Sequence, residues 1–164
     1  MSAPVRIVGC GRWAMGDDQA GLTVADCLRR KNLPGTAVLI EEAPGAGLAD
    51  ESLGEVELLV IIDAARAGCR HPAGSFRRID YPEGLRGISA ASGVDTHSLG
   101  VAAGLELAAA LGVLPAHVWI YLIFGASFDR ALTPSSEVEA AIPRLVERVE
   151  QDITQWVEVR SCTS

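Results

Sequence analysis

Five short apolar runs along the chain predict β-strands. The run Glu57–Ile62 is continuously aliphatic through its interior, which is typical of a central parallel strand buried on both faces. The run Ser75–Tyr81 alternates apolar and polar residues instead, and this alternation predicts an edge strand. The other three runs that are expected to form strands are Val5–Gly9, Ala37–Glu41 and Val118–Phe124.

Helices are expected where apolar residues recur every three or four positions between these strands. Leu22–Arg30 and Thr96–Leu111 are such segments, whereas Leu48–Leu53 suits only a short helical turn. The last helix is expected to open at Thr133–Pro134, because a capping residue is followed there by proline at the first helical position. Pro143 lies inside the apolar stripe of this helix and predicts a kink or a later start.

The order of these elements predicts an α/β fold. Alternating strands and helices favour a largely parallel sheet with helices packed on its faces. We therefore expect a single three-layer α/β/α domain over residues 1–160, with a mostly parallel, twisted sheet of about five strands and a C-terminal tail at 161–164. In such sheets functional side chains gather at the carboxyl ends of the strands, so candidate chemistry is expected there.

Composition narrows the class of protein. The 164 residues are 49% hydrophobic and 21% charged, which fits a folded globular domain. The net charge of −7, from 14 basic and 21 acidic residues without a dense basic cluster, argues against nucleic-acid binding. No apolar run reaches the ~18 residues of a membrane helix, and no signal-peptide pattern follows Met1. We therefore expect a cytoplasmic protein that binds neither membranes nor nucleic acids.

The four cysteines have no paired spacing, so neither a structural zinc site nor a disulfide framework is expected. Cys10 and Cys27 lie in apolar segments and are expected to be core thiols, whereas Cys162 is expected to be exposed in the tail. The sequence also lacks a G-x-S-x-G motif and an evident Cys–His pair. No activated nucleophile is therefore indicated.

A glycine-rich loop follows the first strand at Gly9–Gly21. A dinucleotide-binding loop would have its last glycine where Ala14 stands, and Asp17 and Asp18 would repel a pyrophosphate. Alanine is tolerated at that position, so the charge argument carries more weight than the motif. The two acids suit a bound cation or the capping of the helix that follows, and the residues alone leave both interpretations open.

Two further polar residues stand where the predicted sheet presents its carboxyl ends. Asp63 directly follows an apolar run, and a buried carboxylate there needs a partner, either functional or the backbone amides of the next loop. His97 follows the capping candidates Asp95 and Thr96, which places it in the first turn of a helix. The helix dipole keeps a histidine there neutral, as a metal ligand must be.

Together, Asp18, Asp63 and His97 form a donor set of two carboxylates and one imidazole. Borderline divalent metals such as nickel and zinc accept such ligands. The other two histidines are weaker candidates. His71 lies in a loop not far after Asp63, and His117 opens a strand and is expected at the opposite edge of the sheet.

Three spaced segments resemble the hydrogenase maturation endopeptidases, which trim the C-terminal extension of the nickel-iron hydrogenase large-subunit precursor. They are Ile7–Gly11 with Gly16–Asp18 and Gly21, then Leu59–Ala64, and then Thr96–Gly100 before an Ala/Leu helix. Weaker similarity continues through Val118–Gly125, Leu132–Pro134 and Glu137–Glu139, so the resemblance covers nearly the whole chain in order.

This resemblance implies an endopeptidase in which Asp18, Asp63 and His97 are both the metal ligands and the catalytic residues. It implies that nickel already inserted in the precursor is recognised, with no separate stored or organic cofactor. The hydrogenase large-subunit precursor is then the partner, and we expect the protein to act as a monomer. Nickel would polarise the scissile carbonyl or a water, one carboxylate would act as general base, and Asp17 would be a cap or a supporting group.

The chain departs from the family pattern at two positions of the first loop. Arg12 stands where the family usually has asparagine, and Gln19 stands where it often has glycine. Arg12 places a cation near the expected metal site, where it would contact the tail of the substrate or weaken metal binding.

Two other functions stay open at the level of the sequence. These departures suit a non-catalytic metal-sensing or chaperone protein on the same scaffold, which would bind the large subunit without shortening it. The third interpretation is a nucleotide-binding α/β domain, in which Glu41 and Glu42 at the end of the second strand would hold a ribose.

Overall fold

The chain folds as alternating strands and helices, as the pattern predicts. The computed structural model describes residues 4–42, 48, 50–84 and 96–162, of which 96–99 are described by their backbone alone. The strands and helices, including the short 3₁₀ helices η1 and η2, are β1 (Val5–Cys10), η1 (Gly16–Gln19), α1 (Ala20–Lys31), β2 (Thr36–Glu41), η2 (Glu51–Glu55), β3 (Leu58–Arg66), β4 (Phe76–Asp80), α4 (Thr96–Ala110), β5 (His117–Gly125) and α5 (Ser136–Ser161).

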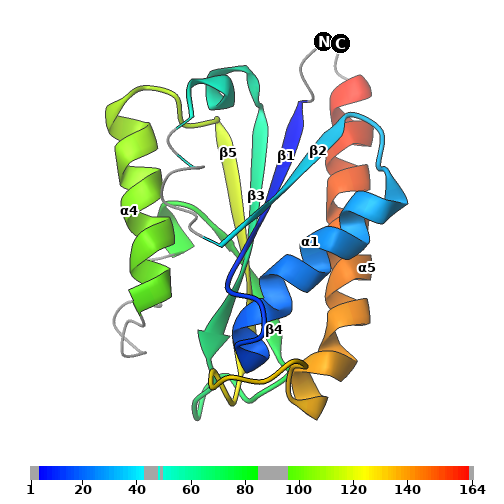
Figure 1. The fold of residues 1–164 in the computed structure, drawn as a ribbon. Helices are drawn as coiled ribbons and strands as arrows, with labels where there is room; N and C mark the ends of the chain where they lie inside the picture. Colours follow the sequence, from blue (N-terminus) through cyan, green and yellow to red (C-terminus); the bar gives the residue numbers. More distant parts are fainter. Residues whose placement is uncertain (1–3, 43–47, 49, 85–95, 163–164) are drawn as a thin grey trace.

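A five-stranded sheet in the order β2-β1-β3-β5-β4 forms the middle layer. The first four strands of this order are parallel, and β4 runs antiparallel to β5 at the edge. Figure 1 shows α4 on one face of the sheet and α1 with α5 on the other. The predicted α/β fold with a mostly parallel sheet is therefore confirmed, including the edge position of β4.

Two apolar clusters, one on each face of the sheet, hold the layers together. The central strand β3 contributes to both clusters, because successive side chains of a strand point to opposite faces. Val60 and Ile62 pack toward α1 and α5, whereas Leu59 and Ile61 pack on the face that α4 covers. The aliphatic run expected to be buried on both faces is therefore the centre of the fold.

Strand β3 is longer than the apolar run predicted. It continues past Ile62 to Arg66, because its register with β5 continues as far as the pair Arg66 and Gly125. The expectation that Asp63 directly follows the strand is therefore wrong. Asp63 lies within β3, paired with Leu122 of β5.

Helix α5 begins two residues later than the expected Pro134 start. Its N-cap is Ser135, so the prediction that Thr133 caps the helix is wrong. The helix then runs for 26 residues and contains Pro143 in its interior. Neither α5 nor any other helix in the described part of the chain is long and apolar enough to cross a membrane.

Helix α1 starts in close contact with the backbones of β1 and β3. A side chain at Gly21 would place its Cβ 2.4 Å from the carbonyl oxygens of Cys10 and Ile62. These oxygens belong to the backbones of β1 and β3 and cannot move aside without disturbing the sheet. Glycine at position 21 therefore lets the start of α1 lie against the carboxyl end of β1 and the neighbouring part of β3.

Asp17 ties η1 to the loop between β5 and α5. Its carboxylate accepts hydrogen bonds from the backbone N–H groups of Ala126 (2.7 Å), Ser127 (3.0 Å) and Ser135 (2.6 Å), and from the Ser135 hydroxyl (2.9 Å). Its side chain also packs against Gly125, where an added Cβ would lie 2.5 Å from that of Asp17. Asp17 makes no side-chain cap to its own helix. Its expected capping role is therefore replaced by one that holds two loops together.

The close approach at Gly21 predicts a large effect of a single methyl group. We expect Gly21→Ala to lower the free energy of unfolding by at least about 2 kcal/mol, because the clash is with backbone on two strands. Gly54→Ala is the matched control, since an added Cβ there meets nothing within 4 Å, and its effect should stay below about 1 kcal/mol. Urea unfolding of both variants measures the difference, and equal stabilities would contradict the role of Gly21.

The Asp17 contacts predict a second stability effect. Asp17→Asn turns one acceptor oxygen into a donor that faces backbone N–H groups, so we expect a loss of about 2–3 kcal/mol in the free energy of unfolding. Ser135→Ala removes only the hydroxyl and should cost about 1 kcal/mol. Thermal and urea unfolding of the two variants test this order, and an Asp17→Asn protein as stable as the wild type would refute it.

Candidate functional site

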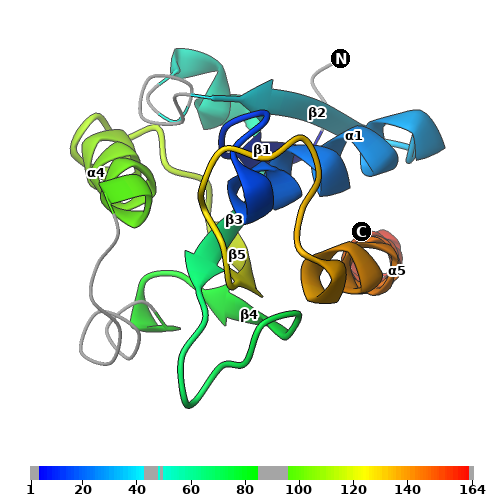
Figure 2. The same cartoon turned by 60° about the horizontal axis from the view of Figure 1, so that its bottom comes forward.

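The segments that carry the expected site residues lie at the carboxyl edge of the sheet, as the sequence predicts. The parallel strands end at the bottom of Figure 1, and α4 starts at the same edge. Figure 2 brings this edge forward and shows the loops after β1, β3 and β5 around it. Asp18 belongs to η1, Asp63 to β3 and His97 to the first turn of α4. The backbone therefore brings all three segments to one edge, while the side chain of His97 lies outside the described residues.

Asp63 points from β3 toward the face that α4 covers. Every second residue of a strand points to the same face, so Asp63 lies on the face where Leu59 and Ile61 pack. Its side chain is 2% exposed, and its Oδ1 accepts a hydrogen bond of 2.8 Å from the Ala64 N–H. Burial raises the pKa of Asp63 to about 7, although the Ala64 hydrogen bond lowers it in part.

Asp18 is the second buried acid at this edge, at 1% exposure. Its Oδ2 accepts a 2.8 Å hydrogen bond from Nε of Arg12. Gly11 makes this geometry accessible, because it has φ of +141° and a Cβ there would lie 1.9 Å from the Asp18 carbonyl oxygen. The loop after β1 therefore folds back onto η1 and carries Arg12 to the Asp18 carboxylate.

The two carboxylates influence each other. The negative charge on Asp18 adds to the rise in the pKa of Asp63, although the two residues are far apart in the sequence. Among residues whose side chains are described, no group of three potential metal ligands lies together. The structure thus brings Asp18 and Asp63 into one electrostatic environment. Two carboxylates fit a divalent cation as hard oxygen ligands, and such a cation would offset their mutual repulsion.

Cys10 lies on the same face of the sheet as Asp63 but is not a reactive thiol. Burial, followed by the negative charges of Asp63 and Glu41, raises the pKa of Cys10 well above its ordinary value. A thiol in this state stays protonated and is a poor nucleophile. The prediction of a core thiol is confirmed for Cys10 but not for Cys27, which is half-buried and packs against the edge of the core. Cys162 is exposed, as expected.

Two polar residues, one in η1 after β1 and one after β2, have roles that the sequence did not indicate. Buried Gln19 donates from Nε2 to the carbonyl oxygens of Gly16 (2.9 Å) and Ala131 (3.3 Å), which joins η1 to the loop after β5. Glu42 accepts a hydrogen bond of 2.9 Å from the Trp13 N–H through Oε1. Glu42 is one of the two acids that a nucleotide-binding domain would use for a ribose, and here it binds the loop after β1 instead.

The remaining histidines occupy different edges. The ring of His71 stacks on Phe124 near the carboxyl end of β5, with ring centroids 4.3 Å apart. His117 is the first residue of β5 and makes an edge contact with Trp156 at 6.0 Å. The expectation that His117 lies at the opposite edge of the sheet is therefore confirmed.

Comparison with known proteins points to one family. A family model described as hydrogenase maturation protease matches residues 47–152, well over half of the chain. This segment includes Asp63 and His97, whereas Asp18 precedes it. No match was found among curated proteins.

Solved structures of such proteases share the fold. The [NiFe] hydrogenase maturation protease HybD from Thermococcus kodakarensis is 25% identical, with a TM-score of 0.71 over 90% of this chain and 97% of that one. The hydrogenase 2 maturation peptidase from a Thaumarchaeota archaeon is 28% identical, with a TM-score of 0.65 over 91% and 97%. The hydrogenase maturating endopeptidase HybD from E. coli, at 19% identity, has a TM-score of 0.75 over 92% of each chain and supports the fold alone. From the family match over most of its length, this chain belongs to the hydrogenase maturation protease family.

Proposed function

We propose that this protein is an endopeptidase that removes the C-terminal extension of a nickel-loaded [NiFe]-hydrogenase large-subunit precursor. Asp18, Asp63 and His97 recognise the nickel that the precursor carries. The observation that supports this function best is the pair of buried acids Asp18 and Asp63, which belong to two separate segments at the carboxyl edge and influence each other electrostatically. The start of α4 at the same edge supports the place of His97 beside them.

The chemistry of the donor set fits a metal presented by a substrate better than a stored one. Two carboxylates and one imidazole leave coordination positions open for ligands that the precursor itself provides. Processing is then conditional on nickel, since a precursor without the metal lacks the group that joins it to these residues. No resident cofactor is required by this scheme.

The proposed reaction is metal-assisted hydrolysis of one peptide bond. The nickel polarises the scissile carbonyl or a water, and a carboxylate oxygen of the site accepts the proton of that water. The water oxygen bonds to the carbonyl carbon, the C–N bond breaks, and the departing amine takes up a proton. The carboxylates of Asp18 and Asp63 are the candidates for this proton acceptor.

Removing a ligand should stop processing without unfolding the protein. We expect Asp63→Asn and His97→Ala each to slow cleavage of the nickel-loaded precursor by at least about 100-fold, because each removes a group that holds the metal. Mass spectrometry of the precursor measures loss of its C-terminal peptide.

Cys10→Ala is the matched control for these variants, since it changes a buried neighbour of Asp63 that takes no part in the reaction. It should retain cleavage within about threefold of the wild type. Normal cleavage by both Asp63→Asn and His97→Ala would overturn the proposed ligand set. Intact precursor after incubation with the wild-type protein would favour a non-catalytic binding protein.

The raised pKa of Asp63 predicts that activity and stability change with pH in opposite directions. A proton on Asp63 competes with nickel, so processing should increase as the pH rises through about 7. The folded-state pKa lies above the ordinary value of 3.8. Protonated Asp63 therefore makes its full contribution to the free energy of unfolding below about pH 4. This contribution is lost as the pH rises through about 7.

Asp63→Asn cannot ionise and should lack this loss. Urea unfolding between about pH 5 and pH 8 should show the wild type losing stability relative to Asp63→Asn, by at most about 3 kcal/mol. A constant difference between the two proteins over this range would show that Asp63 is already ionised at the lower pH.

A further inference from the structure

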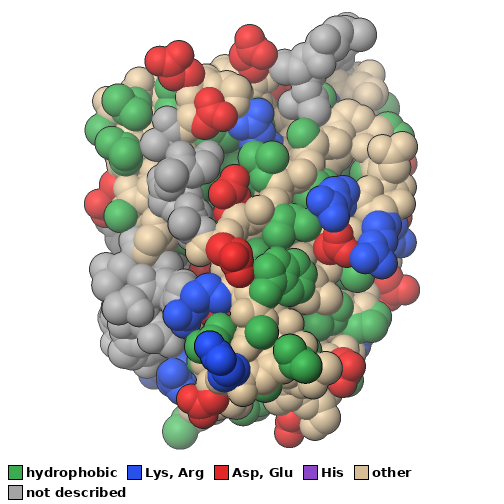
Figure 3. Space-filling view, viewed as in Figure 1, with side chains coloured by type: hydrophobic (Ala, Val, Ile, Leu, Met, Phe, Trp, Pro, Cys, Tyr) green, Lys and Arg blue, Asp and Glu red, His purple; other side chains and the backbone are tan. Residues whose placement is uncertain are grey.

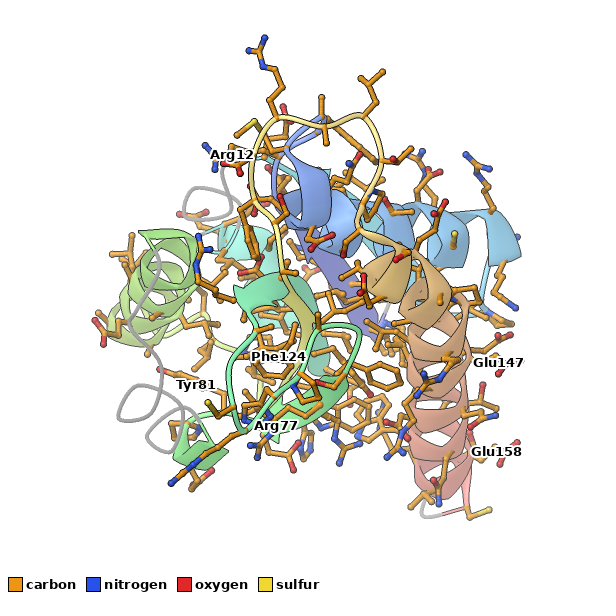
Figure 4. All side chains as sticks on the ribbon, turned by 90° about the horizontal axis from the view of Figure 1, so that it is seen from below. Arg12, Arg77, Tyr81, Phe124, Glu147 and Glu158 are labelled. Carbon is orange, nitrogen blue, oxygen red and sulfur yellow. The ribbon has the colours of Figure 1, made fainter. Side chains whose placement is uncertain are left out.

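The guanidinium of Arg12 lies where a cation bound to Asp18 would lie. Its Nε donates to Oδ2 of Asp18 at 2.8 Å, a normal distance for a charge-assisted hydrogen bond. The Asp18 side chain is 1% exposed, whereas that of Arg12 is 45% exposed. In Figure 4, which looks onto the carboxyl edge, Arg12 lies at the rim beside the start of η1. The buried acid is therefore covered by a cation that reaches in from the surface.

The backbone holds Arg12 at this place from both sides. Gly11, with its φ of +141°, brings the preceding peptide against η1. On the other side, the Trp13 N–H is held by Glu42 Oε1 at 2.9 Å. The main chain is therefore anchored on both sides of Arg12, and its side chain reaches from there to the Asp18 carboxylate.

We propose that Arg12 is a displaceable cation. It hinders the binding of free divalent ions to Asp18 and is displaced by the nickel that the precursor presents. This inference rests on the proposed function, because it assigns a specificity-determining role at the same site. Arg12 is thus a selectivity residue, and it adds no ligand to the metal.

Competition for one oxygen is the physical basis of this role. The Arg12 guanidinium occupies one acceptor site of Oδ2 and offsets the negative charge of the Asp18 carboxylate. A free hydrated ion therefore meets a nearby positive charge that repels it, and it also loses part of its own hydration with only the site residues as new ligands. Nickel on a precursor brings the contacts of the whole protein partner, which offset that cost.

The exposure of Arg12 makes the displacement reversible. A fully buried guanidinium would lose its partner without regaining water, which is strongly unfavourable. Nearly half of the Arg12 side chain already faces solvent, so its charge can be hydrated once it leaves Asp18. Arg12 can therefore neutralise the buried Asp18 carboxylate in the substrate-free protein and still leave it when the precursor binds.

Other cations lie toward the same edge and provide a control. Figure 3 shows Lys and Arg side chains toward the lower end of the molecule, which is the carboxyl edge in Figure 1. Arg130 is one exposed cation of the loop after β5, and the bridge between Met15 and Ala131 joins that loop to the loop of Arg12. Arg130→Gln removes the same charge as Arg12→Gln without removing the contact with Asp18.

The test is calorimetric titration of the substrate-free protein with nickel chloride. We expect Arg12→Gln to bind nickel at least about tenfold more tightly than the wild type, the size expected for loss of one competing charge-assisted hydrogen bond. Arg12→Lys and Arg130→Gln should both stay within about threefold of the wild type. Adding Asp18→Asn to Arg12→Gln should abolish the gain, and circular dichroism of each variant verifies folding.

Cleavage of the nickel-loaded precursor provides the second readout. Added free nickel should inhibit Arg12→Gln at concentrations that leave the wild type active, because free metal can then occupy the site. Equal nickel affinity in Arg12→Gln and wild type, an equal gain in Arg130→Gln, or no nickel binding by Arg12→Gln would overturn the role of Arg12. Absence of cleavage by the wild type would instead refute the proposed peptidase, while the affinity comparison would still decide the role of Arg12.

Discussion

The buried carboxylate pair is the constraint on which the whole site depends. Asp18 and Asp63 are 1% and 2% exposed, so water solvates neither charge well. The charge on Asp18 nevertheless reaches Asp63 and helps to raise its pKa. Two such groups are compatible with folding when a proton or a nearby cation neutralises part of their charge. Arg12 supplies a cation at Asp18, and a raised pKa favours a proton on Asp63. In the proposed mechanism, a metal ion replaces the proton and the Arg12 cation at these two carboxylates.

The rest of the fold holds this pair in place. Gly21 allows the start of α1 to touch the strands, and Asp17 joins η1 to the loop that leads into α5. Adjacent acids in the sequence thus have different tasks. Asp17 is satisfied by four hydrogen bonds from one loop and serves structure, whereas Asp18 faces Arg12 at the rim. Membership of the hydrogenase maturation protease family gives this arrangement its functional context.

Local sequence patterns predicted the sheet and the family. Contacts between distant segments set the ends of the elements and the partners of the site residues. The aliphatic run of β3 identified the central strand, but its end depended on pairing with β5 as far as Gly125. The start of α5 was misplaced because Ser135 bonds to Asp17 across 118 residues, which no local cap signal encodes. The contact between Arg12 and Asp18 spans six residues, but it depends on a backbone conformation at Gly11 that composition does not specify. The sequence therefore indicated Asp18 and Asp63 as candidates but did not indicate the residues that contact them.

The protonation state of Asp63 tests this account most directly. Infrared difference spectroscopy of the wild type and Asp63→Asn can detect the carbonyl band of a protonated buried carboxylic acid. A band that is present at about pH 6, fades as the pH passes about 7 and is missing in Asp63→Asn would agree with a carboxylate pair that holds a proton until a cation replaces it. If the wild type shows no such band at about pH 6, Asp63 is already ionised and the two carboxylates do not form the coupled pair described here.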